Sequence, residues 1–510
     1  MSSRAPDREL TIEVTAEPAG WTFSAANAEA HQTPSDLGDD LLVLREALGF
    51  GVPVDGADDK AAAIVASLER LAAEVGDTLT ALLPQEARDA LDRLAAGAAV
   101  SGPVLVRLRV DGLDANRVLL LPWELLRSGG GFPLARGEID LVREVVRPGL
   151  EQGLPEAPPP LTVVSHLAAP EGEDVPPLNL EEAAFRMAQA LDHLRERTRF
   201  TELGTVGDLK AAVAAVKPTL LHFAGHGLPG KLLFEDDACA AEEVAVDELL
   251  NHLRLAAGGR LPLAVWLSCC YGAGPLGELA ETLGERLAGA AAGRGASSET
   301  SREAGREWQA FTVESPSLCA DLHHAGIPQV LGYFGPVPDA LAVEVDRRLF
   351  EGLTGGGSGV EAVRQARLAT RNPIATPEGK VRFPLAWALL ALYHRGPDRP
   401  LAVPRGALPA AVEEALEPEV LQLEGVEVLR HGFIGRRRLL ADLRKRRRQR
   451  ERTLGLYGLG GLGKTATMTR LASILTGGGP GWHQRVLVVP AGERLRPESG
   501  EPDDPFLWLW

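Results

Sequence analysis

Between residues 161 and 395, short apolar runs alternate with amphipathic segments of helical period, and this alternation restricts the fold more than any other feature of the sequence. The apolar runs are "LTVVSHLA" (161–168), "TLLHFAG" (219–225), "LPLAVWLSCC" (261–270) and "IPQVLGYFG" (327–335). The helical segments include "NLEEAAFRMAQALDHLRER" (179–197), "DALAVEVDRRLFEGL" (339–353) and "GVEAVRQARLATR" (359–371). Strands that alternate with helices are typical of parallel sheets. We therefore predict an α/β fold with a mostly parallel sheet flanked by helices.

The chain of 510 residues is too long for one hydrophobic core, and two proline-containing stretches divide it. Residues 1–150 predict an α+β region, with helices near 58–75 and 84–97 and a strand in "GPVLVRLRV". The stretch "EQGLPEAPPP" (151–160) is a linker, and residues 161–397 form the α/β domain. A second linker spans 398–430, and residues 431–510 form a separate, partial α/β module.

Composition and charge exclude several classes of protein. The net charge of −17 argues against a general nucleic-acid-binding protein. The polar N-terminus lacks the apolar segment of a secretory signal, and no apolar run reaches the roughly 18 residues needed to cross a bilayer. The four cysteines form no regular framework, as expected in a reducing compartment; they are Cys239, Cys269, Cys270 and Cys319. We predict a cytoplasmic protein with no membrane partner.

Two of the predicted strands end in residues suited to nucleophilic chemistry. "TLLHFAGHG" places His226 at the end of one strand, and "LAVWLSCCYGAG" places Cys270 at the end of another. Ligands of open parallel sheets bind beyond the carboxyl ends of the strands, so both residues are expected at one site. A cysteine nucleophile needs a neighbouring base, because a thiol pKa of about 8.5 leaves little thiolate at neutral pH. The separation of 44 residues is close to the roughly 50 of the caspase His-to-Cys spacing.

Each of these residues also has a simpler interpretation. His222 and His226, four residues apart, would form a metal-binding pair on a helix, but their β-branched and aromatic neighbours favour a strand. Taken alone, Cys270 is more often a small core residue than a nucleophile, because free cysteines are among the most buried residues. The two strand ends together, each followed by glycine, favour catalysis.

The same residues resemble the CHAT family of caspase-like peptidases, from about residue 40 to residue 397. "LPWELL" (121–126) is similar to the family's N-terminal signature, "LLHFAGHG" (220–227) to its histidine motif and "WLSCCYG" (266–272) to its cysteine motif. "SLCADLHHAGIPQVLGYFGPVPDALA" (317–342) and "AWALLALYHRG" (386–396) are similar to its closing strand and helix. The set is specific, whereas each piece alone is weak.

The resemblance implies hydrolysis of peptide bonds in a protein substrate by a His226–Cys270 dyad, without a cofactor for this reaction. Cys269 would be the strand neighbour of the nucleophile. By the same resemblance, the backbone N–H groups of Gly227 and Cys270 would form the oxyanion hole. The family usually has a small hydroxyl residue or glycine soon after the nucleophile, so Tyr271 is a departure that affects the substrate cleft rather than the dyad.

Three further features carry weaker signals. The acidic run Glu235–Asp236–Asp237 is more often a solvated turn than a selector of a basic substrate residue. The polar stretch between Cys270 and Ser315 lies where caspases carry a processing linker, and it is either a tolerated surface insertion or a mobile, self-cleaved loop. Trp123 is expected to pack in a core between the N-terminal region and the sheet.

Residues 458–465, "GLGGLGKT", match the phosphate-binding loop G-x-x-x-x-G-K-[ST] in full, between a predicted strand and a predicted helix. In such a loop, glycine N–H groups wrap the phosphates of ATP, the lysine reaches the β- and γ-phosphates, and the hydroxyl binds Mg²⁺. The residues predicted to bind the nucleotide and its Mg²⁺ are Gly458, Gly460, Gly461, Gly463, Lys464 and Thr465.

The preceding "FIGRRRLLADL" (433–443) resembles the leading segment of signal-transducing (STAND) P-loop ATPases of the NB-ARC/NACHT type, which implies that Arg436 lies near the nucleotide. The basic helix 436–450 has no interleaved aromatic residues, so a solvated helix is favoured over nucleic-acid binding. No apolar run ending in acidic residues follows the loop, and the about 45 remaining residues are too few for a whole P-loop domain. We interpret the module as the front of a longer protein or a degenerate relative, which weighs against ATP hydrolysis.

Taken together, the sequence predicts a cysteine endopeptidase regulated by a C-terminal STAND-type ATPase that oligomerises, a pairing that resembles prokaryotic defence systems. The alternative is a non-catalytic signalling scaffold in which the caspase-like fold binds partners and the module senses nucleotide. A stand-alone NTPase is disfavoured by the missing segments.

Overall fold

The computed structural model describes most of the chain up to residue 403. The described residues are 8–25, 28–32, 44, 47–54, 59–149, 153–172, 175, 178, 180–191, 197–201, 203–228, 230–236, 239–269, 317–376 and 379–403, with isolated positions between 436 and 471. The chain divides into two compact units, Met1–Leu416 and Glu417–Trp510. The boundary between them falls within the linker predicted at residues 398–430.

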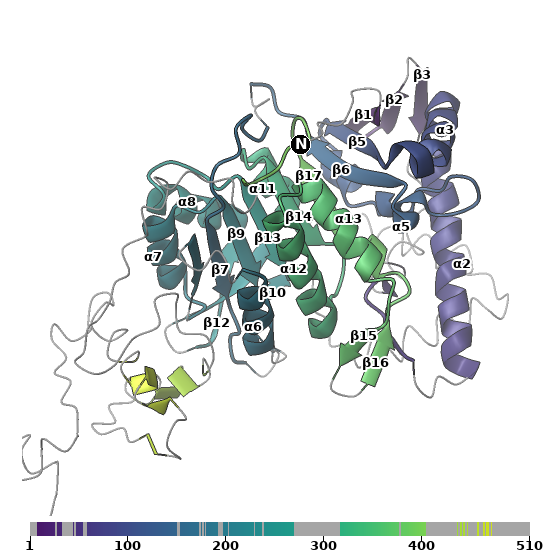
Figure 1. Ribbon diagram of the computed structural model, residues 1–510. Helices are drawn as coiled ribbons and strands as arrows, with labels where there is room; N and C mark the ends of the chain where they lie inside the picture. Colours follow the sequence, from purple (N-terminus) through teal and green to yellow (C-terminus); the bar gives the residue numbers. More distant parts are fainter. Residues whose placement is uncertain are drawn as a thin grey trace, which may run out of the picture. The chain divides into compact units, whose positions relative to one another are not determined.

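In the described part of the first unit, an 11-stranded sheet runs in the order β3-β2-β1-β5-β6-β17-β14-β13-β9-β7-β8 (Figure 1). The strands are β1 (Glu9–Glu17), β2 (Gly20–Ala25), β3 (Ala28–Gln32), β5 (Val104–Asp111), β6 (Ile139–Val145), β7 (Val163–Leu167), β8 (Thr198–Phe200), β9 (Leu220–Ala224), β13 (Ala264–Ser268), β14 (Gln329–Tyr333) and β17 (Leu390–His394). Among these described strands, the pairs β1–β2, β2–β3 and β14–β17 are antiparallel. The other pairs are parallel. The predicted α/β fold with a mostly parallel sheet is confirmed.

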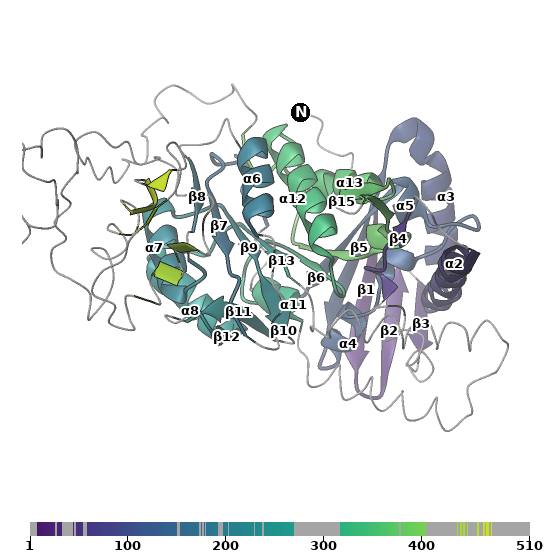
Figure 2. The same cartoon turned by 90° about the horizontal axis from the view of Figure 1, so that it is seen from below.

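Helices cover both faces of this sheet (Figures 1 and 2). One face carries α6 (Leu180–Ala190), α12 (Asp339–Thr354) and α13 (Gly359–Ala369), and the other carries α7 (Val206–Val216), α8 (Val246–Ala256) and α11 (Leu318–His324). The central strands β9, β13 and β14 are buried along their whole length, which explains why they read as continuous apolar runs. None of the helices in the described part of the chain has the length and apolar character needed to span a membrane.

Local sequence determines where several of these helices begin. Thr205, Ser317 and Ser358 directly precede α7, α11 and α13, and each side-chain oxygen accepts a hydrogen bond from the backbone N–H three residues further on. Such caps satisfy donors that the first helical turn leaves without an intrahelical partner.

The N-terminal region extends the main sheet beyond the linker predicted at residues 151–160. Strands β1, β2, β3, β5 and β6 belong to the same sheet as the strands between 161 and 397. They are connected and covered by α2 (Asp59–Ala81), α3 (Gln85–Ser101), α4 (Ala115–Leu119), the 3₁₀ turn η2 (Trp123–Leu125) and α5 (Pro133–Arg136). The helices predicted near 58–75 and 84–97 are confirmed, and both extend further toward their C-termini.

The "PWELL" segment forms η2 and is buried against the N-terminal strands. Trp123 is 1% exposed and its ring centroid lies 5.7 Å from that of Phe23, which confirms its predicted structural role. Glu124 is fully buried and accepts hydrogen bonds from Arg143 of β6 on both carboxylate oxygens, at 2.6 and 2.7 Å. Burial lowers the pKa of Arg143, but neighbouring groups, first among them the Glu124 carboxylate, raise it, and the net pKa lies above its usual value. The signature motif therefore contributes a buried ion pair that holds η2 on the sheet.

Replacement of Glu124 tests how much this ion pair contributes to the stability of the fold. Glu124→Ala leaves the buried guanidinium of Arg143 without its carboxylate, a change that typically costs about 3–5 kcal/mol. We expect a decrease of several degrees in the unfolding midpoint, measured by differential scanning fluorimetry. Glu138→Ala is the matched control: Glu138 pairs with Arg136 at 2.7 Å near the surface, where loss of a pair costs at most about 1 kcal/mol. Equal midpoints for the two variants would contradict this interpretation.

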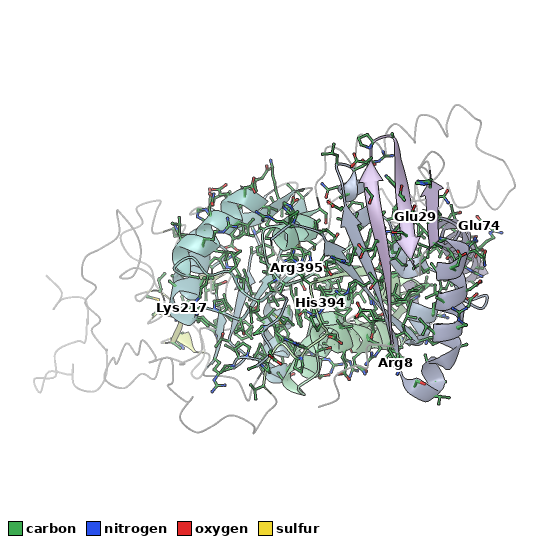
Figure 3. The ribbon with its side chains drawn as sticks, turned by 90° about the horizontal axis from the view of Figure 1, so that it is seen from above. Arg8, Glu29, Glu74, Lys217, His394 and Arg395 are labelled. Carbon is green, nitrogen blue, oxygen red and sulfur yellow. The ribbon has the colours of Figure 1, made fainter. Side chains whose placement is uncertain are left out.

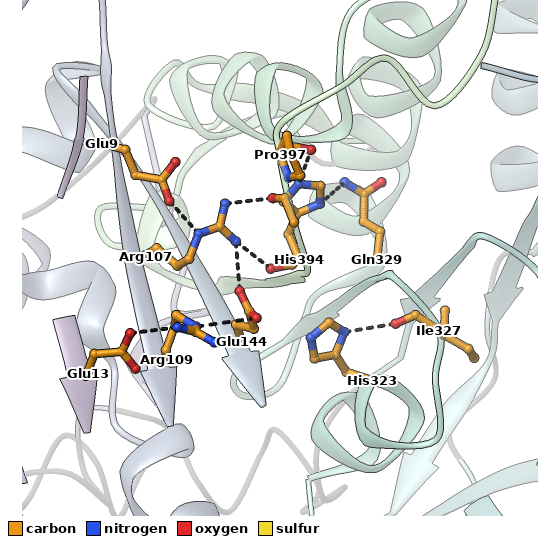
Figure 4. A network of polar contacts seen from close by, with 11 residues as sticks. Glu9, Glu13, Arg107, Arg109, Glu144, His323, Ile327, Gln329, His394 and Pro397 are labelled. Atoms are coloured by element: carbon orange, nitrogen blue, oxygen red, sulfur yellow. Dashed lines mark hydrogen bonds and ion pairs between the residues drawn. The ribbon is translucent and has the colours of Figure 1, made fainter. Parts of the chain in front are cut away.

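The seam between β6 and β17 is held largely by side chains. The two strands are paired in parallel at one position, Tyr393 opposite Arg143. The Arg107 guanidinium of β5 reaches across this seam and donates to the carbonyl groups of His394 and Gly396 at 3.0 and 2.8 Å (Figure 4). The Arg107 side chain thus supplies hydrogen bonds to β17 and the residues after it, where the short β6–β17 ladder supplies few between backbones.

His394 is the centre of this seam. Gln329 donates to its Nδ1 at 3.4 Å, and its Nε2 donates to the carbonyl of Pro397 at 3.2 Å (Figure 4). Figure 3 places His394 and Arg395 among the packed side chains between the N-terminal strands and the rest of the sheet. Burial, reinforced by the positive charge of Arg107, lowers the pKa of His394 to about 3. The ring therefore stays neutral in the folded chain at any ordinary pH.

This depressed pKa predicts a loss of stability in mild acid. An unfolded histidine binds a proton below about pH 6.5, whereas folded His394 binds one only near pH 3, so folding becomes less favourable as the pH falls through that window. Each pH unit below 6.5 costs about 1.4 kcal/mol, or about 2 kcal/mol at pH 5. We expect His394→Gln to flatten the fall in unfolding midpoint between pH 7 and pH 5 relative to the exposed control His31→Gln. Identical pH profiles for these two variants would refute the role of His394.

Among the described residues, two three-stranded antiparallel sheets accompany the main sheet. One contains β10 (His226–Leu228), β11 (Lys231–Glu235) and β12 (Ala241–Ala245), and it lies beyond the carboxyl end of β9 (Figure 1). The other contains β15 (Ile374–Thr376), β16 (Gly379–Arg382) and β4 (Val52–Pro53). The 3₁₀ turn η4 (Ala386–Ala388) leads into β17.

The second unit is described at isolated positions. Those of the predicted basic helix are helical at 439–440, 442–443 and 446, and those after the phosphate loop are helical at 464, 466–468 and 471. Leu440, Leu443 and Leu471 form a small buried cluster with Leu439 packed against it, so the two helical stretches share an apolar contact.

Candidate functional site

β9 and β13 are neighbouring parallel strands, and the two predicted catalytic motifs follow them. Their register pairs Ala224 with Ser268, and paired residues throughout the ladder are 44 positions apart in sequence. His226 and Cys270 are separated by the same 44 positions, and each follows the last pair by two residues. Because the strands are parallel and in this register, the chain leaves both of them at the same edge of the sheet.

His226 begins β10 directly after a turn at Gly225. Its side chain is 5% exposed, and its backbone pairs with Leu233 of β11. A β-carbon at Gly225 would lie 2.8 Å from the carbonyl oxygen of Ala168 and 2.9 Å from the ring of Phe223, so glycine is needed for the close approach of these segments. The turn thereby fixes where the histidine leaves the sheet.

The cysteine motif is described as far as Cys269. Cys269 is 4% exposed, and the N–H of Gly225 donates to the carbonyl of Ser268 at 3.3 Å, which joins the two strand ends. Cys270, Tyr271 and the polar stretch to Ser315 lie outside the described residues. The His226–Cys270 dyad and the self-cleaved loop therefore stay predictions.

Gly227, predicted to supply an oxyanion-hole N–H, lies in β10 opposite Leu232. In the described part of the chain, β10 is the outer strand of its small sheet, with β11 on one side. Gly227 thus lies on the outer of the three described strands of this sheet, three residues after the end of β9. Its role in oxyanion binding stays a prediction.

A buried polar network that the sequence interpretation missed lies directly before these strand ends. His222 of β9 contacts the hydroxyl of Ser165 on β7 through Nδ1 at 3.0 Å. Its Nε2 lies 3.3 Å from the hydroxyl of Ser268 on β13 and 3.3 Å from a carboxylate oxygen of Asp346 on α12. Ser268 in turn donates to the other carboxylate oxygen of Asp346 at 2.5 Å. All four side chains are buried, with 0–9% exposure.

This network replaces the metal interpretation considered for His222. The residue lies in a strand, as the neighbouring residues predicted, and both of its ring nitrogens have protein partners. Within the described ranges, no cluster of three or more His, Cys, Asp or Glu side chains is suited to a metal ion.

Glu235 differs from both interpretations of the acidic run. It is 3% exposed, and its two carboxylate oxygens accept hydrogen bonds from the N–H groups of Ala169 and Gly204, each at 2.9 Å. It therefore joins the segments that follow β7 and β8 instead of lying in a solvated turn or facing a substrate. Asp236 does lie in a turn, where its carboxylate accepts from the N–H of Ala240, and Asp237 lies outside the described residues.

Three residues of the predicted nucleotide site are described. Gly463 has a left-handed backbone with φ of +69°, which favours glycine, and helical structure begins at Lys464. The guanidinium of Arg436 lies 3.9 Å from the position of a β-carbon on Gly463, and its predicted position near a nucleotide stays a prediction. Gly458, Gly460, Gly461 and Thr465 lie outside the described residues, and binding of ATP and Mg²⁺ stays a prediction.

Comparison with protein families identifies the class to which this fold and these motifs belong. The model of the CHAT domain matches residues 22–395, which is most of the chain. The chain belongs to the CHAT domain family. A comparison of the sequence with curated proteins gives no match.

Two solved structures are similar at a distance. The Arg-specific cysteine proteinase gingipain R (RgpB) superposes with a TM-score of 0.37 at 10% identity, over 64% of this chain and 70% of the proteinase. A complex of the pro- and mature domains of RgpB from Porphyromonas gingivalis gives 0.36 at 9% identity, over 64% of this chain and 72% of that chain. Likenesses this distant carry no argument about the site.

Substitution at Gly225 tests the tight turn before His226. Gly225→Ala places a methyl group against backbone and a buried ring, and such overpacking costs about 1–3 kcal/mol. We expect a lower unfolding midpoint by calorimetry. Gly97→Ala is the control, since nothing lies within 4 Å of its β-carbon position and alanine favours a helix by up to about 1 kcal/mol. If Gly225→Ala is as stable as the control, the turn does not require glycine.

Proposed function

We propose that this protein is a caspase-like cysteine endopeptidase in which Cys270 is the nucleophile and His226 the base. The observation that supports this most directly is the parallel register of β9 and β13, whose offset of 44 residues equals the separation of the two motifs. Membership of the CHAT domain family and the buried turn at Gly225 support the same assignment.

The proposed reaction cleaves one peptide bond in two steps. His226 takes the proton of the Cys270 thiol, and the thiolate attacks the carbonyl carbon of the scissile bond. The protonated imidazole then gives its proton to the leaving amine, which leaves an acyl-enzyme thioester. Water attacks the thioester while His226 takes its proton, and the released thiol is ready for the next cycle.

The oxyanion of the tetrahedral intermediate would be held by backbone donors from both motifs. We assign the N–H groups of Gly227 and Cys270 to this role. The position of Gly227 on the outer strand of the β10–β12 sheet supports the assignment, because in the described part of the chain one side of this strand has no strand partner. Fixed donors at a developing charge commonly contribute 10²–10³-fold to the rate.

We further propose that the C-terminal module binds ATP with Mg²⁺ and regulates the peptidase, as in STAND ATPases. The match of residues 458–465 to the phosphate-binding loop, the left-handed Gly463 and the nearby Arg436 guanidinium support nucleotide binding. Oligomerisation through this module would couple a signal to cleavage of a protein substrate in the cytoplasm. A role in prokaryotic defence follows from this pairing of modules.

A peptide-library cleavage screen with and without ATP and Mg²⁺ tests the proposal. Cys270→Ala and His226→Ala should each lower the cleavage rate by at least about 10³-fold, because removal of either member of a catalytic pair disables the whole pair. Cys269→Ala is the matched control and should retain activity. Lys464→Ala should abolish any stimulation by ATP.

The scaffold alternative predicts a different result. In that case the wild-type protein cleaves no peptide, and Cys270→Ala binds partners as the wild type does. Retention of cleavage by Cys270→Ala would reject the assignment of the nucleophile.

A further inference from the structure

The buried network around Asp346 bridges the two strands that precede the catalytic motifs. One carboxylate oxygen accepts the hydroxyl of Ser268 on β13 at 2.5 Å, and the other lies 3.3 Å from Nε2 of His222 on β9. Asp346 is 2% exposed and lies on α12, a helix that packs over the sheet and is separate in sequence from β9 and β13. One side chain from a covering helix therefore contacts both strands at once.

The strand residues that Asp346 contacts lie a few positions before the proposed catalytic residues in the sequence. Ser268 is the last residue of β13, two positions before Cys270, and His222 lies four positions before His226. The carbonyl of Ser268 also accepts the N–H of Gly225, so side-chain and backbone bonds hold the same pair of strand ends. A shift of β9 relative to β13 would have to break these bonds together.

The wider contacts of the network restrict it further. His222 is anchored on its other side by Ser165 of β7, and its ring packs edge-on against Phe350, one helical turn after Asp346 on α12, with a centroid distance of 5.5 Å. The hydroxyl of Ser268 donates to one oxygen of the buried carboxylate, and Nε2 of His222 lies 3.3 Å from the other. The network is thus a rigid connection between α12 and three adjacent strands.

We propose that Asp346 is a positioning residue for the His226–Cys270 pair, acting through His222 and Ser268 to hold the carboxyl ends of β9 and β13 in register. This inference rests on the proposed peptidase function. Asp346 touches no substrate, so its contribution is geometric: a displacement of about 1 Å between reacting groups lowers rates by about 10²-fold.

The chemistry of the carboxylate makes the role specific. An asparagine at this position keeps one acceptor oxygen and replaces the other with an NH₂ donor, which then faces either the Ser268 hydroxyl or His222. The Ser268 hydroxyl can accept from this NH₂ group only if it gives up its own donation, and His222 can accept only as the tautomer without a proton on Nε2. The substitution therefore rearranges the polar contacts between α12 and at least one of the two strands, even though the size of the side chain is unchanged. Asp346→Asn is accordingly the informative substitution.

The test compares Asp346→Asn with Asp140→Asn. Asp140 of β6 is a matched control because it is also a buried carboxylate, 1% exposed, and pairs with Arg364 of α13 at 2.7 Å. In the order of the sheet, β6 lies on the other side of β17 from β9 and β13. Both variants should lower the unfolding midpoint. We expect kcat for a cleaved library peptide to fall 10–100-fold in Asp346→Asn with KM changed less than twofold, while Asp140→Asn changes neither by more than twofold.

A second measurement does not depend on peptide cleavage. The rate of alkylation of Cys270 by iodoacetamide, followed by peptide mass spectrometry across pH 5–9, reports the environment of the thiol. We expect Asp346→Asn to move the midpoint of this profile toward that of His226→Ala, and Asp140→Asn to match the wild type. Ser268→Ala should produce a smaller shift in the same direction, because it removes one of the two contacts of Asp346. Combining it with Asp346→Asn should give less than the sum of the two effects, because the two residues share that contact.

The outcomes separate this inference from the proposed function. If no peptide is cleaved but the alkylation profile still depends on His226 and Asp346, peptide hydrolysis is rejected and the positioning role stands. If the wild type cleaves peptide and Asp346→Asn behaves as Asp140→Asn in both measurements, the positioning role is overturned. Should Asp346→Asn fail to fold, Ser268→Ala decides: wild-type kcat and alkylation in that variant overturn the proposal.

Discussion

The parallel pairing of β9 with β13 is the constraint on which the candidate site depends. Adjacent parallel strands present their carboxyl ends at one edge, and the register of this pair matches the spacing of the two motifs in the chain. The surrounding contacts support that pairing. The turn at Gly225 admits no side chain, and a backbone bond to Ser268 joins the strand ends. The pairing of β9 with β13 thereby brings together strand ends that are 44 residues apart in sequence.

Side-chain contacts stabilise the main sheet where its N-terminal strands join the later strands, at the β6–β17 pair. Strands β1, β2, β3, β5 and β6 meet the later strands at β17, where Arg107 and the neutral His394 make hydrogen bonds that the short β6–β17 ladder does not. Glu124 performs a related task from outside the sheet, since its buried pair with Arg143 anchors η2. The "PWELL" motif is thus explained by stability, and no contact to the candidate site is needed to account for it.

The residues predicted from motifs and the residues found by structure differ in kind. The position of His226 just beyond the end of β9 was predictable, because glycines frame it after an apolar run. His222 and Ser268 lie four and two residues before the proposed dyad. As polar residues within apolar strand runs, they indicated only weakly that a buried polar network lies there. Asp346 carried none, because it lies 78 positions after Ser268 in a helix of ordinary amphipathic pattern. Glu235 was misinterpreted, because an acidic run shows its charge but not the backbone amides that the fold brings to it.

The sequence by itself determined the α/β class, the four central strands and three of the helices of residues 161–395 and the motif at each strand end, because hydrophobic period and capping residues act locally. Tertiary structure decided the strand order, the continuation of the sheet into the N-terminal region and the partners of every buried charge. These depend on contacts between segments far apart in the chain, as between Arg107 and Gly396 or His222 and Asp346. A local pattern specifies which face of an element is buried, but only the assembled fold selects what it is buried against.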